Sequence, residues 1–174
     1  MSYAVLFPGQ GSQNKDMLEP YLKDPIFSGI LEQSSQILGY NIIEAVEDES
    51  KLNNTLYTQP IMVAVTYAMW CVWREKSPDL PSYAAGHSLG EYSALVASNV
   101  LSLKDAVRIV QKRGQLMQAA VPLGAGGMAA VPRDRRGPQF GTVRRRHSCR
   151  SSGHELADRH VRAVAGDRRF SCRA

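Results

Sequence analysis

Residues 3–120 alternate short apolar runs with longer stretches in which apolar residues recur at helical spacing. The runs at 3–7 and 83–85 are too short for helices and lie next to proline and glycine, so they predict two β-strands. The longer stretches predict helices at 25–38, 41–48, 60–75, 91–100 and 103–120, with an amphipathic segment at 17–22 and a polar connection at 49–57. This order of strands and helices predicts an α/β fold with helices packed on a parallel sheet.

Local signals mark where some of these helices begin and end. Asp24 followed by Pro25 predicts an N-cap and a first helical residue, and Gly39 predicts the end of the same helix. Pro60 is interpreted in the same way as the first residue of the helix at 60–75. That helix is apolar on nearly every face, which predicts that it is buried.

The charge of the chain is unevenly distributed. The chain has 174 residues, enough for one domain with a substantial core, and a formal net charge of +5. Residues 1–132 carry 9 Lys and Arg against 12 Asp and Glu, whereas residues 133–174 carry 12 Arg, no Lys and only 4 acidic residues. The positive charge therefore belongs to the last part of the chain alone.

The Arg-rich segment allows two interpretations. It could be a basic tail that binds nucleic acid or another acidic partner. Alternatively, it is not native coding sequence, because a GC-rich gene read out of frame gives an Arg-, Ala- and Gly-rich product with little lysine. We favour the second interpretation, since the change in composition is abrupt. We accordingly divide the chain into an ordered region, 1–127, and an atypical, disordered tail, 128–174.

Cysteine usage and glycine spacing bear on location and cofactors. Cys71, Cys149 and Cys172 form an odd and unclustered set, which favours a reduced cytoplasmic protein without metal sites. The sequence has no dinucleotide-binding glycine fingerprint and no apolar run long enough to span a membrane. We therefore expect neither a metal nor another cofactor, and no membrane attachment.

The pentapeptide 86–90, Gly-His-Ser-Leu-Gly, has the form G-x-S-x-G. This pattern places a serine on a sharp turn between a strand and a helix, with its hydroxyl exposed as a nucleophile. The predicted strand before it and the predicted helix after it match that context. The competing interpretation is an ordinary Gly/Ser turn with a buried histidine.

Four motifs occur together and in order: FPGQGSQ at 7–13, YTQP at 57–60, GHSLGEYSAL at 86–95 and RGQLMQ at 113–118. With them, the chain resembles the malonyl-CoA:acyl carrier protein transacylases of type II fatty acid synthesis over about residues 3–131. The resemblance implies an α/β-hydrolase-like large subdomain with a parallel sheet, which would be incomplete here. The ferredoxin-like small subdomain of the family is not recognisable in the sequence.

The resemblance also implies roles for particular residues. Ser88 would take malonyl from malonyl-CoA as a serine ester and pass it to the phosphopantetheine thiol of acyl carrier protein. The backbone N–H groups of Gln10 and Leu89 would form the oxyanion hole, and Arg113 would bind the malonyl carboxylate. His87 would be a supporting neighbour of the serine. Without the family pattern, Arg113 would be interpreted as a solvated helix cation.

The resemblance does not extend to the catalytic histidine, which lies far beyond the nucleophile in the family. That position would fall after residue 174, and His147, His154 and His160 stand in sequence unlike that of the family. We therefore expect a chain that is truncated or frameshifted after about residue 131 and impaired in catalysis, since a serine without a base is poorly activated.

Three functions remain in competition. The first is malonyl transfer by a monomer whose partners are malonyl-CoA and acyl carrier protein. The second is another serine acyltransferase or hydrolase, such as the acyltransferase of a polyketide synthase. The third, of a different class, is a non-catalytic basic protein that binds nucleic acid, and we rank it below the two enzymes.

Overall fold

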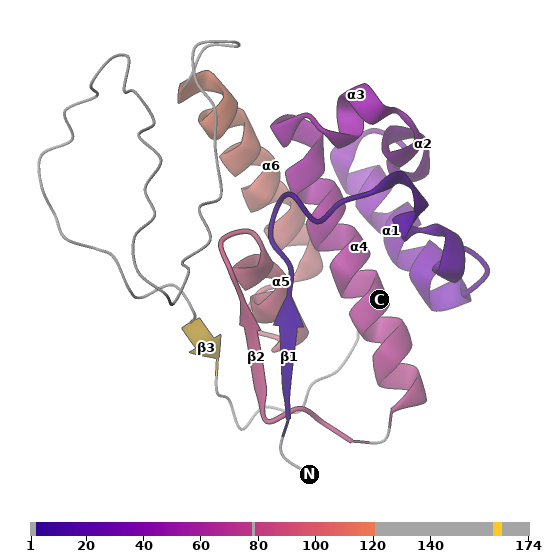
Figure 1. Cartoon of the computed structure of the whole chain (residues 1–174), viewed down its shortest axis with the longest axis vertical. Coiled ribbons are helices and arrows are strands. Elements are labelled where there is room, and N and C mark those ends of the chain that lie inside the picture. Colours follow the sequence, from indigo (N-terminus) through magenta and orange to yellow (C-terminus); the bar gives the residue numbers. More distant parts are fainter. Residues whose placement is uncertain (1–2, 78, 121–161, 165–174) are drawn as a thin grey trace, which may run out of the picture.

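A computed structural model of the chain describes residues 3–77, 79–120 and 162–164, the last three as backbone only. The order of elements alternates strands with groups of helices (Figure 1). The elements are β1 (Ala4–Phe7), η1 (Lys15–Met17), η2 (Glu19–Tyr21), α1 (Pro25–Leu38), α2 (Ile42–Glu47), α3 (Glu49–Leu52), α4 (Thr55–Lys76), β2 (Tyr83–Gly86), α5 (Gly90–Ala97), α6 (Leu103–Ala120) and β3 (Arg162–Val164).

The sheet confirms the predicted parallel pairing of the first two strands. β1 and β2 run parallel with Ala4 opposite Tyr83 and Phe7 opposite Gly86, so the carboxyl ends of both strands lie at the same edge. β3 pairs antiparallel with the other side of β2. It comes from the segment 128–174, for which we predict disorder; the rest of that segment lies outside the described residues.

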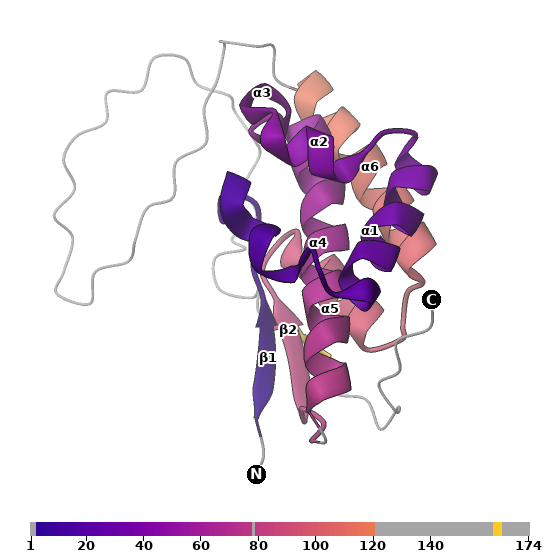
Figure 2. The ribbon, with the colours of Figure 1, turned by 90° about the vertical axis from the view of Figure 1, so that its right-hand side faces the viewer.

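Helix α4 is the centre of the helical layer. It packs against α1, α5 and α6, and Ile61, Val63 and Ala64 on it are completely buried. Figure 2 shows β1 and β2 along one side of the helices, with α4 and α5 next to them. The predicted burial of this helix is therefore confirmed. In the described part of the chain, no helix is both long and apolar enough to cross a membrane.

The predicted beginning and end of α1 are confirmed. The Asp24 carboxylate accepts hydrogen bonds from the N–H groups of Ile26 and Phe27, and α1 ends at Gly39, as predicted. The predictions for α2 and α6 are also confirmed.

The predicted polar connection at 49–57 is wrong. Asp48 caps the short helix α3, and the Asn54 side chain accepts from the Leu56 N–H at 3.0 Å, which starts α4 at Thr55. Pro60 lies inside α4, where it removes one helical hydrogen bond. An asparagine cap therefore sets this boundary, and the proline does not.

Helices α4 and α6 approach each other closely at Gly114. A Cβ at this position would lie 2.8 Å from the Thr55 carbonyl oxygen, nearer than side-chain carbons lie to backbone oxygens. Gly114 is buried in the middle of α6, where glycine is otherwise an unfavourable helix residue. The close contact accounts for its presence there, and it sets the position of the last turns of α6.

We predict opposite effects for two glycine-to-alanine substitutions in helices. Gly114→Ala should lower the free energy of unfolding by about 1–3 kcal/mol, because the new methyl group forces α4 and α6 apart. Gly29→Ala, on α1, should raise it by about 0.5–1 kcal/mol, because a Cβ there meets no atom within 4 Å. Urea unfolding of both variants measures the difference. Equal effects would contradict the close helix contact.

Candidate active site

Ser88 lies on the turn between β2 and α5, as the G-x-S-x-G pattern predicts. Its φ is 55°, in the left-handed region that costs about 1–2 kcal/mol for a residue with a Cβ. Its side chain is exposed to solvent. Backbone strain of this kind persists only where the surrounding structure enforces it.

The two glycines of the motif enforce the turn. A Cβ on Gly86 would clash with the backbone of Gly90, and a Cβ on Gly90 would clash with the Phe7 carbonyl oxygen. The Pro8 carbonyl oxygen would lie only 2.8 Å from the same Cβ on Gly90. Only glycine allows β1, β2 and the start of α5 to come this close.

This contact brings the loop after β1 against the loop after β2. A Cβ on Gly9 would lie 3.1 Å from the His87 carbonyl oxygen, so the two backbones touch there as well. The N–H groups of Gln10 and Leu89 belong to these two loops, and neither has a hydrogen-bond partner among the described residues. Unpaired backbone donors next to a helix N-terminus are suited to binding a negatively charged oxygen.

Arg113 reaches the serine from α6. Its Nη2 donates to Ser88 Oγ at 3.0 Å. The arginine side chain is half-buried, and neither ion pair of the described residues involves it. Two residues 25 positions apart in the sequence thus lie within hydrogen-bonding distance, and the guanidinium has further N–H donors for a ligand.

The Gln10 loop is braced by short-range hydrogen bonds. Ser12 Oγ donates to the Gly9 carbonyl at 2.8 Å, and the Gly11 N–H donates to Gln13 Oε1 at 2.8 Å. These bonds account physically for the polar residues of the FPGQGSQ motif. They hold the loop in a compact turn.

Gln59, to which the sequence pattern assigns no role, contacts the side chain of Gln10. Its side chain is completely buried in α4, and its Nε2 donates to Gln10 Oε1 at 3.2 Å and to the Met117 sulfur at 3.1 Å. The YTQP motif marks the position, but no sequence pattern indicates that Gln59 meets Gln10. Gln10, Gln59 and Met117 are thus joined by hydrogen bonds, and Arg113, which bonds to Ser88, lies one turn before Met117 on α6.

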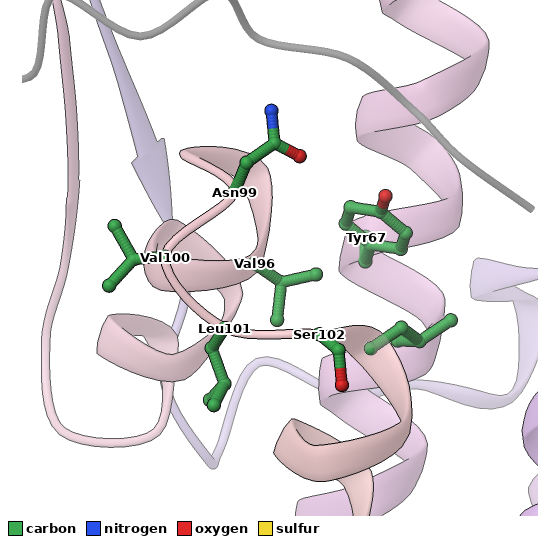
Figure 3. A pocket seen from close by; sticks show the side chains of 7 residues that line it. Tyr67, Val96, Asn99, Val100, Leu101 and Ser102 are labelled. Atoms are coloured by element: carbon green, nitrogen blue, oxygen red, sulfur yellow. The ribbon is translucent and has the colours of Figure 1, made fainter.

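The other candidate features do not take part in these hydrogen bonds. His87 is exposed and makes no hydrogen bond to Ser88. No set of His, Cys, Asp or Glu in the described part of the chain could hold a metal ion. An open pocket of about 390 Å³ lies at the far end of α5 and is lined by Tyr67, Val96, Asn99 and Leu101 among others (Figure 3). None of the predicted site residues lines it.

The fold and the turn at Ser88 define an α/β protein with a serine displayed between a parallel strand and a helix. Residues 5–143 match the family model of the acyl transferase domain, and the chain belongs to that family.

The chain is similar to malonyl CoA-acyl carrier protein transacylases. It is 47% identical to the one from Haemophilus influenzae over 133 residues and 44% identical to the one from Salmonella typhimurium over 132 residues. In both cases the match covers 74% of this chain and 43% of the relative. The chain thus spans less than half the length of these relatives.

Solved structures of malonyl transacylases are also similar to this chain. One is a malonyl-transacylase in complex with its type II polyketide synthase acyl carrier protein, with 46% identity and a TM-score of 0.68 over 70% of this chain and 40% of that one. Another is the malonyl CoA-acyl carrier protein transacylase from Coxiella burnetii, with 40% identity and a TM-score of 0.68 over 71% of this chain and 40% of that one.

The strain at Ser88 predicts a stability difference between two substitutions. Ser88→Gly should have a free energy of unfolding about 0.5–1 kcal/mol higher than that of Ser88→Ala. Glycine adopts the left-handed backbone without strain, and this gain exceeds the stability that glycine loses through the greater entropy of its unfolded state. Chemical denaturation of the two variants side by side makes the comparison. An alanine variant that is more stable than the glycine variant by about 0.5–1 kcal/mol would show that the turn is unstrained.

Proposed function

We propose that this chain carries the acyl-serine half of a malonyl transfer from malonyl-CoA to the phosphopantetheine thiol of acyl carrier protein. The observation that carries the proposal is the hydrogen bond of 3.0 Å from Arg113 to Ser88. It joins an exposed hydroxyl on a strained turn to a cation that suits a free carboxylate. A general serine hydrolase has no use for such a cation beside its nucleophile.

The reaction divides into two transfers. Ser88 Oγ attacks the thioester carbonyl of malonyl-CoA, an O–C bond forms, the C–S bond breaks, and the hydroxyl proton ends on the sulfur of coenzyme A. The carrier-protein thiol then attacks the serine ester, and its proton returns to Ser88. No cofactor takes part, because the acyl donor and the acyl acceptor are both substrates and the serine carries the acyl group between them.

The N–H groups of Gln10 and Leu89 are the proposed donors to the oxyanion of each tetrahedral intermediate. Their support is that both are unpaired and belong to loops in contact at the edge of the parallel strands. A preorganised donor of this kind lowers the barrier by about 3 kcal/mol. The N-terminus of α5 adds a favourable dipole for the same charge.

Arg113 is the proposed ligand of the malonyl carboxylate. A guanidinium presents paired N–H donors that match the two oxygens of a carboxylate, whereas acetyl offers no charge at that point. Nη2 of Arg113 donates to Ser88 Oγ, so the guanidinium lies beside the acylated oxygen and has further N–H donors for the carboxylate. His87 remains a proposed neighbour without a chemical role.

Other parts of the proposal concern the whole protein. We propose that residues 1–127 are the N-terminal part of the α/β-hydrolase-like large subdomain of the family, and that the proton acceptor for Ser88 comes from outside residues 3–120. The odd, unclustered cysteines support a cytoplasmic location. The chain is proposed to act as a monomer toward its carrier protein.

The acceptor has a second candidate. The structure of a malonyl-transacylase bound to a type II polyketide synthase acyl carrier protein is as similar as those of the other transacylases. Incubation of the acylated chain with a holo-carrier protein of each kind, followed by mass spectrometry of the carrier, distinguishes the two acceptors.

Incubation with malonyl-CoA should add one malonyl group to the folded chain. The intact mass of the unchanged protein should increase by that group, and Ser88→Ala should remove the increase because the attacking oxygen is gone. Asn99→Gly, a second left-handed position far from the site, is the control for a general effect on the fold. An adduct that persists in Ser88→Ala would refute the assignment.

Loss of the Arg113 guanidinium should change acyl selectivity. Arg113→Ala should slow acylation by malonyl-CoA about 10- to 100-fold, the value of a charge-assisted contact, while acylation by acetyl-CoA changes much less. Lys112→Ala removes the same charge from the adjacent, exposed position and should leave the malonyl-to-acetyl ratio unchanged. Stopped reactions analysed by mass give both rates. A constant ratio in Arg113→Ala would exclude the carboxylate role.

A further inference from the structure

The side chain of Gln10 is held at both ends by the first turns of α4. Gln10 Nε2 donates to Thr55 Oγ1 at 3.1 Å, and Gln10 Oε1 accepts from Gln59 Nε2 at 3.2 Å. The second N–H of the Gln59 amide points to the Met117 sulfur of α6. Donors and acceptors alternate along this series, so each amide has one orientation that satisfies its neighbours.

We propose that Gln59 is a positioning residue that fixes the loop carrying the Gln10 backbone N–H beside Ser88. It does not touch the reacting atoms and acts only through Gln10. The proposal rests on the function proposed above, because that function is what requires a fixed N–H at this point. An oxyanion donor contributes only if its position is set before the reaction.

Packing alone does not explain why a glutamine occupies position 59. The side chain is completely buried, and its Oε1 has no hydrogen-bond partner among the described residues. A buried amide with an unsatisfied oxygen is costly, and leucine would fill a similar volume without that cost. What leucine cannot supply is a donor to Gln10.

The other side-chain hydrogen bonds of the loop do not connect it to the buried part of the helical layer. The bonds made by Ser12 and Gly11 stay within the loop and are exposed to solvent. Gln13 Nε2 reaches Asn53 Oδ1 at a long 3.4 Å, also in an exposed position. Thr55 and Gln59 therefore supply the protected connection between the Gln10 loop and the helical layer, and Gln59 is the buried member of the pair.

The test compares Gln59→Leu with Thr66→Val. Thr66 lies on the same helix, and its buried hydroxyl bonds to Ser93 Oγ at 2.9 Å and donates to the Met62 carbonyl at 2.7 Å. The control therefore also removes buried side-chain hydrogen bonds but does not touch the Gln10 loop. The first readout is the ¹⁵N order parameter of the Gln10 N–H. It should stay at about 0.85 in the unchanged chain and in Thr66→Val, and fall below about 0.6 in Gln59→Leu.

The second readout is the rate of Ser88 acylation by malonyl-CoA, which should fall about 10- to 100-fold in Gln59→Leu, since a displaced catalytic donor costs up to that much. A rigid Gln10 in Gln59→Leu overturns the proposal, and so does a mobile Gln10 with an unchanged acylation rate. Should Gln59→Leu not fold, Gln59→Asn takes its place. Asparagine keeps the amide but is one methylene too short to reach Gln10, so the same changes in the Gln10 order parameter and in the acylation rate are expected.

The two proposals fail in different ways. If the unchanged chain takes up no malonyl group, the proposed function fails. The order parameter of Gln10 alone then shows whether Gln59 fixes the position of the loop. If the unchanged chain is acylated and Gln10 stays rigid without Gln59, the function stands and the positioning role is refuted.

Discussion

The contact between the Gly90 backbone and the Phe7 carbonyl is the constraint on which the site depends. Parallel strands bring their carboxyl ends to one edge, and the absence of a side chain at Gly90 lets the loops after β1 and β2 meet there. The same contact leaves Ser88 in the left-handed region with its hydroxyl exposed. Strain at one residue is thus the consequence of close packing at its neighbours.

The helical layer completes the arrangement from the other side. Gly114 lets α6 lie close to the start of α4, which brings Arg113 within hydrogen-bonding distance of Ser88 and Met117 next to Gln59. The Gln10 loop is tied to the same turns of α4. Segments distant in sequence therefore meet at one point because two glycines permit two close backbone contacts.

The parts of this structure that were predictable from sequence are those with a local cause. The cap at Asp24, the end of α1 at Gly39 and the strand–turn–helix around Ser88 each depend on residues next to one another in the chain, and all three are present. The predicted start of α4 is wrong because Pro60 gives the local signal of a first helical residue, whereas the Asn54 cap starts the helix at Thr55 and leaves the proline inside it. The hydrogen bond from Gln59 to Gln10 joins residues 49 positions apart, and it follows only from how α4 packs.

A crystal structure of the chain after incubation with malonyl-CoA would show whether Ser88, the two backbone N–H groups and Arg113 act on the same acyl group. We expect an ester on Ser88 Oγ, with its carbonyl oxygen about 2.7–3.1 Å from the backbone nitrogens of Gln10 and Leu89 and its free carboxylate on the Arg113 guanidinium. An unmodified Ser88, or an ester whose carbonyl oxygen faces away from both nitrogens, would contradict it.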